Sequence, residues 1–209
     1  MLILTEQTMK IDPVKLSEAV AFAADKHSDQ TRKRAKDDPR PRIPYISHLM
    51  AVSGMVIEDG GDTDEAIAGL LHDYIEDIDE DGADELEQRF GARVRDLVIG
   101  CSGPKKEQIP DFRTRKQLYL DHLTSTRDDG AVRVSLADKV HNARSTVSDL
   151  ETDGPSVWDR FNAGVEDQLW WYGSLSAAYT DHAEDGRADE QRAAELQRLV
   201  ARMKEFGGQ

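Results

Sequence analysis

The sequence predicts an all-α protein, and three features of its 209 residues support this prediction. Apolar residues recur at helical spacing along most of the chain. Glycine and proline residues fall between these periodic segments, where they commonly end helices. No stretch alternates apolar and polar residues as a half-buried strand does. We therefore expect a single all-α domain over residues 1–209.

The first half of the chain predicts five helices. Asp12 is a favourable N-cap and Pro13 suits the first helical position, so the first helix should begin here. Gly60-Gly61 should end the second helix, and Gly91 should separate the fourth from the fifth. The expected ranges are 14–30, 45–58, 64–77, 83–90 and 92–99. The Pro- and Arg-rich stretch 31–44 is expected to be a loop.

The second half of the chain predicts four more helices after a Gly/Pro-containing loop over residues 100–111. The expected ranges are 113–124, 132–150, 158–180 and 188–206. Segment 158–180 should be the longest helix, and segment 188–206 should be a C-terminal helix. His182 is expected on a helix surface.

Composition excludes several classes of protein. The formal net charge of -14 argues against nucleic-acid binding, which depends on neutralising phosphates. No apolar run approaches the roughly 18 residues that span a membrane, and residues 1–10 lack the basic segment of a signal peptide. The single Cys101 fits a reducing compartment, so a cytoplasmic location is expected. The sequence indicates no oligomeric state.

One segment departs from the acidic composition. Six of the eleven residues from 32 to 42 are basic, namely Arg32, Lys33, Arg34, Lys36, Arg40 and Arg42. Two interpretations are open: a solvated loop, or the mouth of a site that attracts a polyanionic small molecule.

The stretch LLHDYIED carries the densest set of groups that bind metals or move protons. On one continuous helix, His72 would share a face with Glu76, and Asp73 would share a face with Asp77. Like charges at this spacing destabilise a helix, and a divalent cation would neutralise them.

Two further residues could complete a metal site. His48 and Asp138 both lie in apolar helical surroundings, where a charged group needs a partner. Two imidazoles with two carboxylates suit Mn²⁺, Fe²⁺, Co²⁺ or Zn²⁺ better than Ca²⁺ or Mg²⁺, which prefer oxygen ligands.

These residues lie within longer motifs that resemble a known family. The pattern His48, His72-Asp73 and Asp138 looks like that of the HD-domain metal-dependent phosphohydrolases. Four motifs occur in the order and spacing of the hydrolase domain of RelA/SpoT alarmone enzymes: QTRK (30–33), PYISH (44–48), LLHDYIED (70–77) and LADKVHN (136–142). Over roughly residues 15–180 the chain is most similar to the standalone small alarmone hydrolases, which are MESH1-like. The resemblance implies an HD-type helical bundle.

The resemblance also implies roles for residues in the centre of the site. His48, His72, Asp73 and Asp138 would bind one divalent ion per chain, Mn²⁺ by family likeness, although other borderline metals remain open. Glu76 and Asp77 would orient the attacking water and transfer its proton.

Nucleotide contacts are implied in the same way. Arg32 would contact the base and Lys33 the phosphates, while Asn142 and Ser145 would hold the nucleotide. One of Trp171 and Tyr172 would reach the ribose. The loop after QTRK is longer and more basic than in the family, so its arginines have no matching role. A second basic group would neutralise the diphosphate or face solvent; it comprises Lys105, Lys106, Arg113, Arg115 and Lys116.

The implied activity is a Mn²⁺-dependent 3′-pyrophosphohydrolase of (p)ppGpp, acting in the stringent response and yielding GDP or GTP and pyrophosphate. Two alternatives keep the enzyme class: a preference for (p)ppApp, or an HD-type nucleotidase. A third is a protein that binds alarmone without hydrolysing it, which the presence of all six central residues disfavours. The expected partner is a small nucleotide substrate, with neither nucleic acid nor membrane.

Overall fold

The computed structural model describes residues 11–34 and 38–207, and these residues form helices joined by loops. The helices are α1 (Pro13–Lys26), α2 (Ile46–Glu58), α3 (Thr63–Leu71), α4 (Tyr74–Asp77), α5 (Ala83–Phe90), α6 (Ala92–Cys101), α7 (Phe112–Ser125), α8 (Asp129–Asp153), the 3₁₀ helix η1 (Gly154–Arg160), α9 (Val165–Glu184) and α10 (Glu190–Glu205). The described part of the chain contains no strand beyond one isolated bridge between Thr31 and Pro44. The all-α prediction is confirmed. Residues 1–10, where no signal peptide was expected, lie outside the described ranges.

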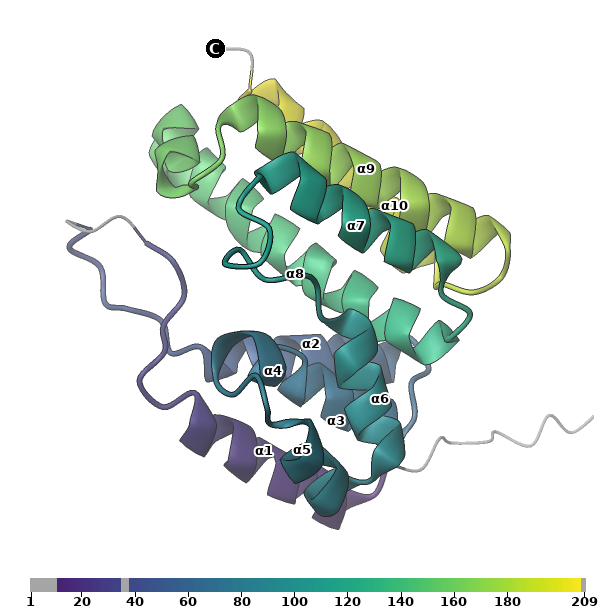
Figure 1. Ribbon diagram of the computed structural model, residues 1–209. Coiled ribbons are helices and arrows are strands. Elements are labelled where there is room, and N and C mark those ends of the chain that lie inside the picture. The colour runs from purple at the N-terminus through teal and green to yellow at the C-terminus, as the bar shows by residue number, and fades with distance from the viewer. Residues whose placement is uncertain (1–10, 35–37, 208–209) are drawn as a thin grey trace, which may run out of the picture.

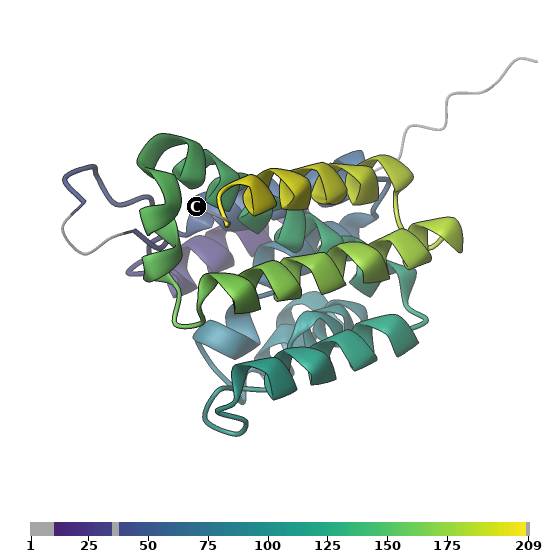
Figure 2. The same cartoon turned by 90° about the horizontal axis from the view of Figure 1, so that it is seen from above.

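The long helix α8 runs through the middle of the bundle (Figure 1). It packs against α2, α3 and α6 on one side and against α10 on the other. Helix α10 packs in turn against α9, and α9 against α7, so that these three helices form the upper layer of the bundle (Figure 2). Helix α3 is buried from Glu65 to Leu71, and after Glu65 its residues are accordingly apolar on all sides. The candidate site lies where α2, the end of α3 and α8 meet.

Many predicted helix ends are correct because their signals are local. Asp12 caps α1 by accepting hydrogen bonds from the backbone N–H groups of Val14 and Lys15. Asp62 forms a capping box with Glu65 at the start of α3. Gly91, with φ of 96°, separates α5 from α6 in a conformation that favours glycine.

The segment 64–77 differs from the prediction because it is not one continuous helix. Helix α3 ends at Leu71, His72 and Asp73 form a turn, and α4 is a separate short helix. Asp73 has φ of -93° and ψ of -1°, outside the usual helical range, and the buried ring of Tyr74 packs on Phe22. The expectation of one continuous helix over this segment was therefore wrong, although the backbone N–H of Asp77 still donates to the carbonyl oxygen of Asp73 at 2.8 Å.

The predicted helix 158–180 is also divided. Residues Gly154–Arg160 form η1, and α9 begins only at Val165, so the longest helix is α8 with 25 residues. Gly154, with φ of 73°, ends α8, and the following turn buries Val157 and Trp158 in the core. His182 is buried rather than on the surface, and its Nε2 lies 2.8 Å from the carbonyl oxygen of Leu123.

Among the described residues no helix is both long and apolar enough to cross a membrane.

Candidate functional site

Three predicted metal ligands meet from three different elements. His48 comes from α2, His72 follows α3, and Asp138 lies on α8, and all three are buried. The Oδ1 atom of Asp138 lies 3.2 Å from Nε2 of His48 and 3.5 Å from Nε2 of His72. One ligand atom from each residue falls within 4.8 Å of the others, a spacing that suits a shared cation.

Asp73 lies beside the two histidines of this group, in the turn after α3. Its Oδ2 atom lies 3.0 Å from Nε2 of His72 and 3.7 Å from Nε2 of His48. The structure thus brings all four residues of the predicted ligand set together.

The ring nitrogens of the two histidines are arranged so that each Nε2 atom can bind a cation. The Nδ1 atom of His72 lies 2.9 Å from the carbonyl oxygen of Gly69, which fixes the ring, and the buried Nε2 atoms of His48 and His72 have no hydrogen-bond partner among the described residues. Burial lowers the pKa of His48, which favours a neutral imidazole. Burial opposes charge on His72 as well, but Asp73 and Asp138 raise its pKa well above the usual value. The carboxylates therefore stabilise positive charge where the two Nε2 atoms converge, and a divalent cation fits this donor set.

Neighbouring side chains orient the ligands. The hydroxyl of Tyr45 donates to Oδ2 of Asp73 at 2.6 Å, and Nζ of Lys139 donates to Oδ2 of Asp138 at 2.6 Å. The Nδ1 atom of His141 lies 2.7 Å from Nδ1 of His48. Such outer contacts fix the tautomer and direction of metal ligands. Sequence reasoning missed Tyr45, Lys139 and His141, although all three lie inside the PYISH and LADKVHN motifs.

Glu76 and Asp77 project from α4 beside the four ligands, and each is held by one hydrogen bond. The backbone N–H of Gly103 donates to Oε1 of Glu76 at 2.7 Å, and Nε2 of Gln30 donates to Oδ2 of Asp77 at 2.6 Å. Both residues are open to solvent on one side, yet desolvation by the surrounding protein raises the pKa of each carboxyl. A raised pKa makes a carboxylate a stronger base near neutral pH.

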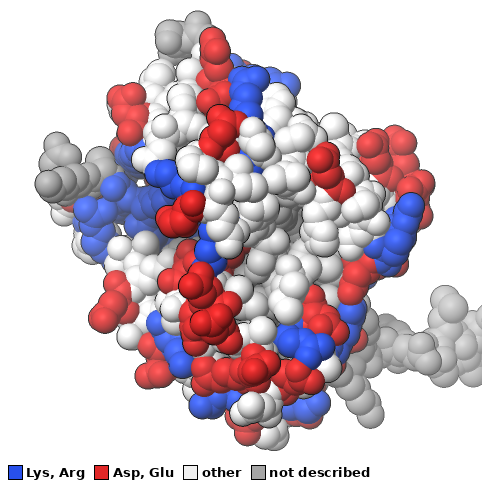
Figure 3. All heavy atoms as spheres, viewed as in Figure 1, with Lys and Arg blue, Asp and Glu red and all other residues white. Residues whose placement is uncertain are grey.

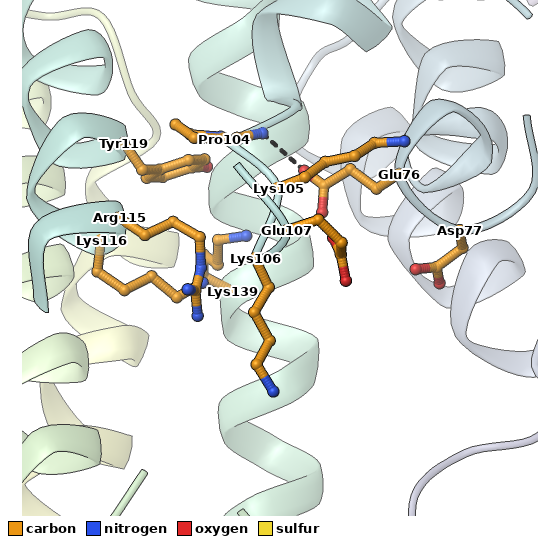
Figure 4. Close-up of a pocket in the computed structure, with 11 residues that line it drawn as sticks. Glu76, Asp77, Pro104, Lys105, Lys106, Glu107, Arg115, Lys116, Tyr119 and Lys139 are labelled. Carbon is orange, nitrogen blue, oxygen red and sulfur yellow. Dashed lines mark hydrogen bonds between the residues drawn. The ribbon is translucent and has the colours of Figure 1, made fainter. Parts of the chain in front are cut away.

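A cationic pocket opens next to Glu76 and Asp77 (Figure 4). Its lining comes from α4, the loop after α6, α7 and α8: Glu76, Asp77, Gly103, Pro104, Lys105, Lys106, Glu107, Arg115, Lys116, Tyr119 and Lys139. In Figure 4, Arg115, Lys116 and Lys139 lie across the pocket from Asp77. Four of the five residues in the second predicted basic group therefore line one cavity. The exception is Arg113, which forms an ion pair with Asp167 at 2.6 Å.

Two of the lysines in the pocket have perturbed pKa values. Burial and the neighbouring charge of Lys139 lower the pKa of Lys116 to about 8. Burial also opposes charge on Lys139, but Asp138 raises its pKa well above the usual value. The pocket thus keeps a fixed positive charge beside the metal ligands, as binding of phosphate groups requires.

Three of the predicted nucleotide-binding residues form a second group on the other side of Asp138. This group, the Arg32 cluster, comprises Arg32, Asn142 and Ser145. The Nη2 atom of Arg32 donates to Oδ1 of Asn142 at 2.8 Å and to Oγ of Ser145 at 3.3 Å. The guanidinium also lies 5.8 Å from the ring centre of Tyr45. Lys33 is exposed, and the described residues give it no hydrogen bond or ion pair that would bring it into this cluster.

The remaining predicted contacts lie around these two clusters. Trp171 and Tyr172 are both buried, and Nζ of Lys116 lies 4.5 Å from the ring centre of Trp171. Arg40 of the basic loop pairs with Asp153 at 2.6 Å, which ties the loop to the end of α8. Basic side chains gather around this loop, at the left edge of Figure 3, whereas acidic side chains are spread over the rest of that face. Lys36 lies outside the described residues.

The fold and the site define a class: this is a metal-dependent phosphohydrolase of the HD type. The HD domain family matches residues 19–165, and the chain belongs to this family.

Curated relatives of the chain are similar over most of its length. The chain is 36% identical over 170 residues to the guanosine-3′,5′-bis(diphosphate) 3′-pyrophosphohydrolase MESH1 of Xenopus tropicalis, a match that covers 78% of this chain and 83% of that protein. The human MESH1 protein matches with the same identity and coverage. The bifunctional (p)ppGpp synthase/hydrolase SpoT of Escherichia coli is 33% identical over 144 residues, covering 66% of this chain and 19% of SpoT.

A solved structure supports the same fold. The structure of a metazoan ortholog of SpoT that hydrolyzes ppGpp superposes with a TM-score of 0.69, covering 92% of this chain and 97% of that one. The two chains are 22% identical, and this likeness shows the fold.

Proposed function

We propose that the protein is a (p)ppGpp 3′-pyrophosphohydrolase that yields GDP or GTP and pyrophosphate. One observation carries the proposal: the four predicted metal ligands lie between the Arg32 cluster and the cationic pocket. Asp138 connects the two sides, because Asn142 of the Arg32 cluster donates to one of its oxygens and Lys139 of the pocket donates to the other. A nucleotide with its base at Arg32 and its 3′-diphosphate among the lysines would place the scissile bond at the metal ligands. The names of the curated relatives support this substrate class.

The reaction breaks the bond between the ribose O3′ and phosphorus, and water supplies the new oxygen on phosphorus. When bound by His48, His72, Asp73 and Asp138, a divalent cation would stabilise charge on the phosphate and acidify the attacking water. Glu76 and Asp77 would orient that water and accept its proton, which their raised pKa values favour. The leaving O3′ takes up a proton and becomes the 3′-hydroxyl of GDP or GTP.

The cationic pocket would hold the diphosphate. Lys105, Lys106, Arg115, Lys116 and Lys139 supply positive charge there, and their side chains suit phosphate oxygens rather than a neutral substrate. On the opposite side, the planar guanidinium of Arg32 would stack on the base, with Asn142 and Ser145 beside it. Lys33 would reach the nucleotide phosphates from the exposed start of the basic loop.

For the metal we propose Mn²⁺, one ion per chain. The mixed set of two imidazoles and two carboxylates supports a borderline divalent ion, and it leaves Fe²⁺, Co²⁺ and Zn²⁺ as competitors. Titration of the metal-free protein with each ion, followed by an activity measurement, ranks them. Mn²⁺ should give the highest turnover.

A second proposal concerns the base. Stacking on Arg32 is compatible with guanine and adenine alike, so (p)ppApp is the principal alternative substrate. An HD-type nucleotidase is a further alternative, and a non-catalytic alarmone-binding protein is disfavoured because Glu76 and Asp77 lie beside the ligand set. We also propose that residues 1–209 act as one domain, supported by the packing of α10 on both α8 and α9.

The test is an assay after chelation and reconstitution with Mn²⁺. The substrates are ppGpp, ppApp and a 5′-deoxynucleotide, and pyrophosphate and phosphate are measured separately. Metal-dependent release of pyrophosphate from ppGpp supports the proposal, and a preference for ppApp would change the substrate. Phosphate released from the 5′-nucleotide would indicate a nucleotidase. No product from a metal-loaded protein would favour the binding protein.

A further inference from the structure

Asn142 lies between the Arg32 cluster and the metal ligands, one helical turn after Asp138 on α8. Its Nδ2 atom donates to Oδ1 of Asp138 at 2.6 Å, and its Oδ1 atom accepts from Nη2 of Arg32 at 2.8 Å. This amide orientation is unambiguous, because a carboxylate only accepts hydrogen bonds and a guanidinium only donates them. Asn142 therefore connects a residue of the nucleotide side to a residue of the metal side.

The oxygen that Asn142 holds is the one that faces both histidines. Oδ1 of Asp138 lies 3.2 Å from Nε2 of His48 and 3.5 Å from Nε2 of His72, whereas Lys139 binds the other oxygen of this carboxylate. Asn142 and Lys139 together fix the rotation of the Asp138 carboxylate. Without the Asn142 amide, Oδ1 would lose its hydrogen bond and the carboxylate would be free to turn toward Lys139.

A second connection runs through Tyr45. Its hydroxyl donates to Oδ2 of Asp73, the oxygen that lies 3.0 Å from Nε2 of His72, and its ring lies 5.8 Å from the guanidinium of Arg32. Arg32 thus contacts two side chains, Asn142 and Tyr45, that each hold a carboxylate of the metal site.

We propose that Asn142 is a positioning residue that couples cation affinity to the binding of a nucleoside at Arg32. A bound cation fixes Asp138, which fixes the Asn142 amide and so presents Arg32 in one orientation for the base. The coupling is positive, and linkage requires it to be reciprocal: a bound nucleoside strengthens cation binding by the same factor. The nucleoside part of this inference rests on the proposed function, but the cation part does not.

The first test measures Mn²⁺ affinity by calorimetry on the metal-free protein, with no nucleotide present. Asn142→Leu keeps a similar side-chain size but cannot donate a hydrogen bond, and Asn142→Ala serves as a second variant. We expect each to weaken Mn²⁺ binding about 10-fold or more, the usual effect of losing an outer contact to a metal ligand. Wild-type Mn²⁺ affinity in a folded Asn142→Leu protein would overturn the proposal.

Ser145→Ala is the matched control for this titration. Ser145 also lies on α8 and also accepts from Arg32, at 3.3 Å, but within the described residues it has no hydrogen bond to Asp138. The Ser145→Ala substitution should leave Mn²⁺ affinity within about twofold of wild type, a much smaller change than the roughly 10-fold weakening expected for Asn142→Leu. Equal weakening in Ser145→Ala and Asn142→Leu would assign the effect to the Arg32 cluster in general and contradict the specific role of Asn142. Circular dichroism and thermal unfolding of each metal-free variant establish that it is folded.

The second test measures the coupling itself with 3′-deoxyguanosine and 3′-deoxyadenosine. These probes carry neither phosphate nor 3′-hydroxyl, so they cannot contact the cation at the scissile position. In the wild type, Mn²⁺ should tighten binding of at least one probe several-fold, and in Asn142→Leu this enhancement should disappear. Enhancement that persists in the variant would overturn the proposal. The hydrolase assay is independent of both titrations, so a failure of the proposed function and a failure of this inference give different results.

Discussion

Gln30 donates a hydrogen bond from Nε2 to Oδ2 of Asp77 at 2.6 Å, across 47 positions in the sequence. Its amide is fixed from behind, because Nδ1 of the buried His27 lies 2.5 Å from Oε1 of Gln30. The ring of His27 in turn stacks against Tyr45, with ring centres 5.5 Å apart. Asp77 is therefore oriented by a residue of the QTRK motif that the sequence alone did not single out.

Replacing Gln30 with Leu should shift the pH dependence of turnover. Desolvation and the charge of Asp73 raise the pKa of the Asp77 carboxyl. The Gln30 hydrogen bond and the nearby His27 and His72 lower it. Losing the bond raises the pKa, so Asp77 becomes a carboxylate only at higher pH. We expect the acidic limb of the kcat profile to move to higher pH and kcat at acidic pH to fall about 10-fold. An unchanged profile would remove Gln30 from this role, and unchanged Mn²⁺ affinity is the control.

Glu76→Gln should nearly abolish turnover without releasing the metal. The substitution keeps the size of the side chain and its acceptor for the Gly103 N–H, but it removes the group proposed to take the proton from water. Loss of a general base costs about 100-fold or more in kcat. The check combines a kcat measurement with metal content of the purified variant. Turnover near that of the wild type would exclude Glu76 as the base.

His72→Ala and Asp73→Ala should lose activity by losing the cation. His72 and Asp73 contribute two of the four converging donors, and their Nε2 and Oδ2 atoms lie 3.0 Å apart. Metal affinity should fall by more than about 100-fold in each, beyond the effect expected for an outer contact. Calorimetric titration with Mn²⁺ measures this directly. If either variant bound Mn²⁺ as the wild type does, that residue would not be a ligand.

Lys116→Gln should raise KM about 10-fold, because a hydrogen bond to a charged group contributes about 1.5 kcal/mol or more. Because burial lowers the pKa of Lys116 to about 8, the wild-type side chain is charged below that pH and neutral above it. The KM of the wild type should therefore rise as pH increases through 8, and the KM of Lys116→Gln should not follow this rise. KM measured from pH 7 to pH 9 at constant ionic strength tests both points.

Arg113→Gln provides the matched control on the same helix. Arg113 carries a similar charge on α7, but it pairs with Asp167 instead of lining the cationic pocket. Its replacement should leave KM within about twofold of wild type, as expected for an exposed ion pair. A similar increase in KM for Arg113→Gln and Lys116→Gln would indicate a general effect of protein charge rather than a pocket contact.

Two glycines should respond oppositely to alanine. A Cβ atom on Gly69 in α3 would lie 3.0 Å from the Cα of Ser53 in α2, and backbone cannot move aside cheaply. Gly69→Ala should lower the free energy of unfolding by about 1–3 kcal/mol. A Cβ on Gly54 would meet nothing within 4 Å. Gly54→Ala should therefore raise the free energy of unfolding by roughly 0.5–1 kcal/mol, because alanine has the higher helix propensity. Chemical denaturation measures both; a stabilised Gly69→Ala protein would contradict the close packing of α2 on α3.

The sequence by itself determined the helical class, most helix boundaries and the residue types of the site. These features depend on local interactions: Asp12 caps α1 through its own side chain, and Gly91 separates two helices through its own φ angle. The motifs carrying His48, His72 and Asp138 were also readable, because each motif is a short run of adjacent residues.

Tertiary packing alone decided how these parts meet. Arg32 and Asn142 are 110 positions apart in sequence, yet they share a hydrogen bond because the loop after α1 lies against α8. The sequence did not indicate that α3 and α4 are separate helices or that Tyr74 is buried at the start of α4. The division of the second basic group follows from the different neighbours of Arg113 and Lys116 on one helix. Helical periodicity specifies which face of a helix is apolar, but the partner of each side chain depends on which other helix covers that face.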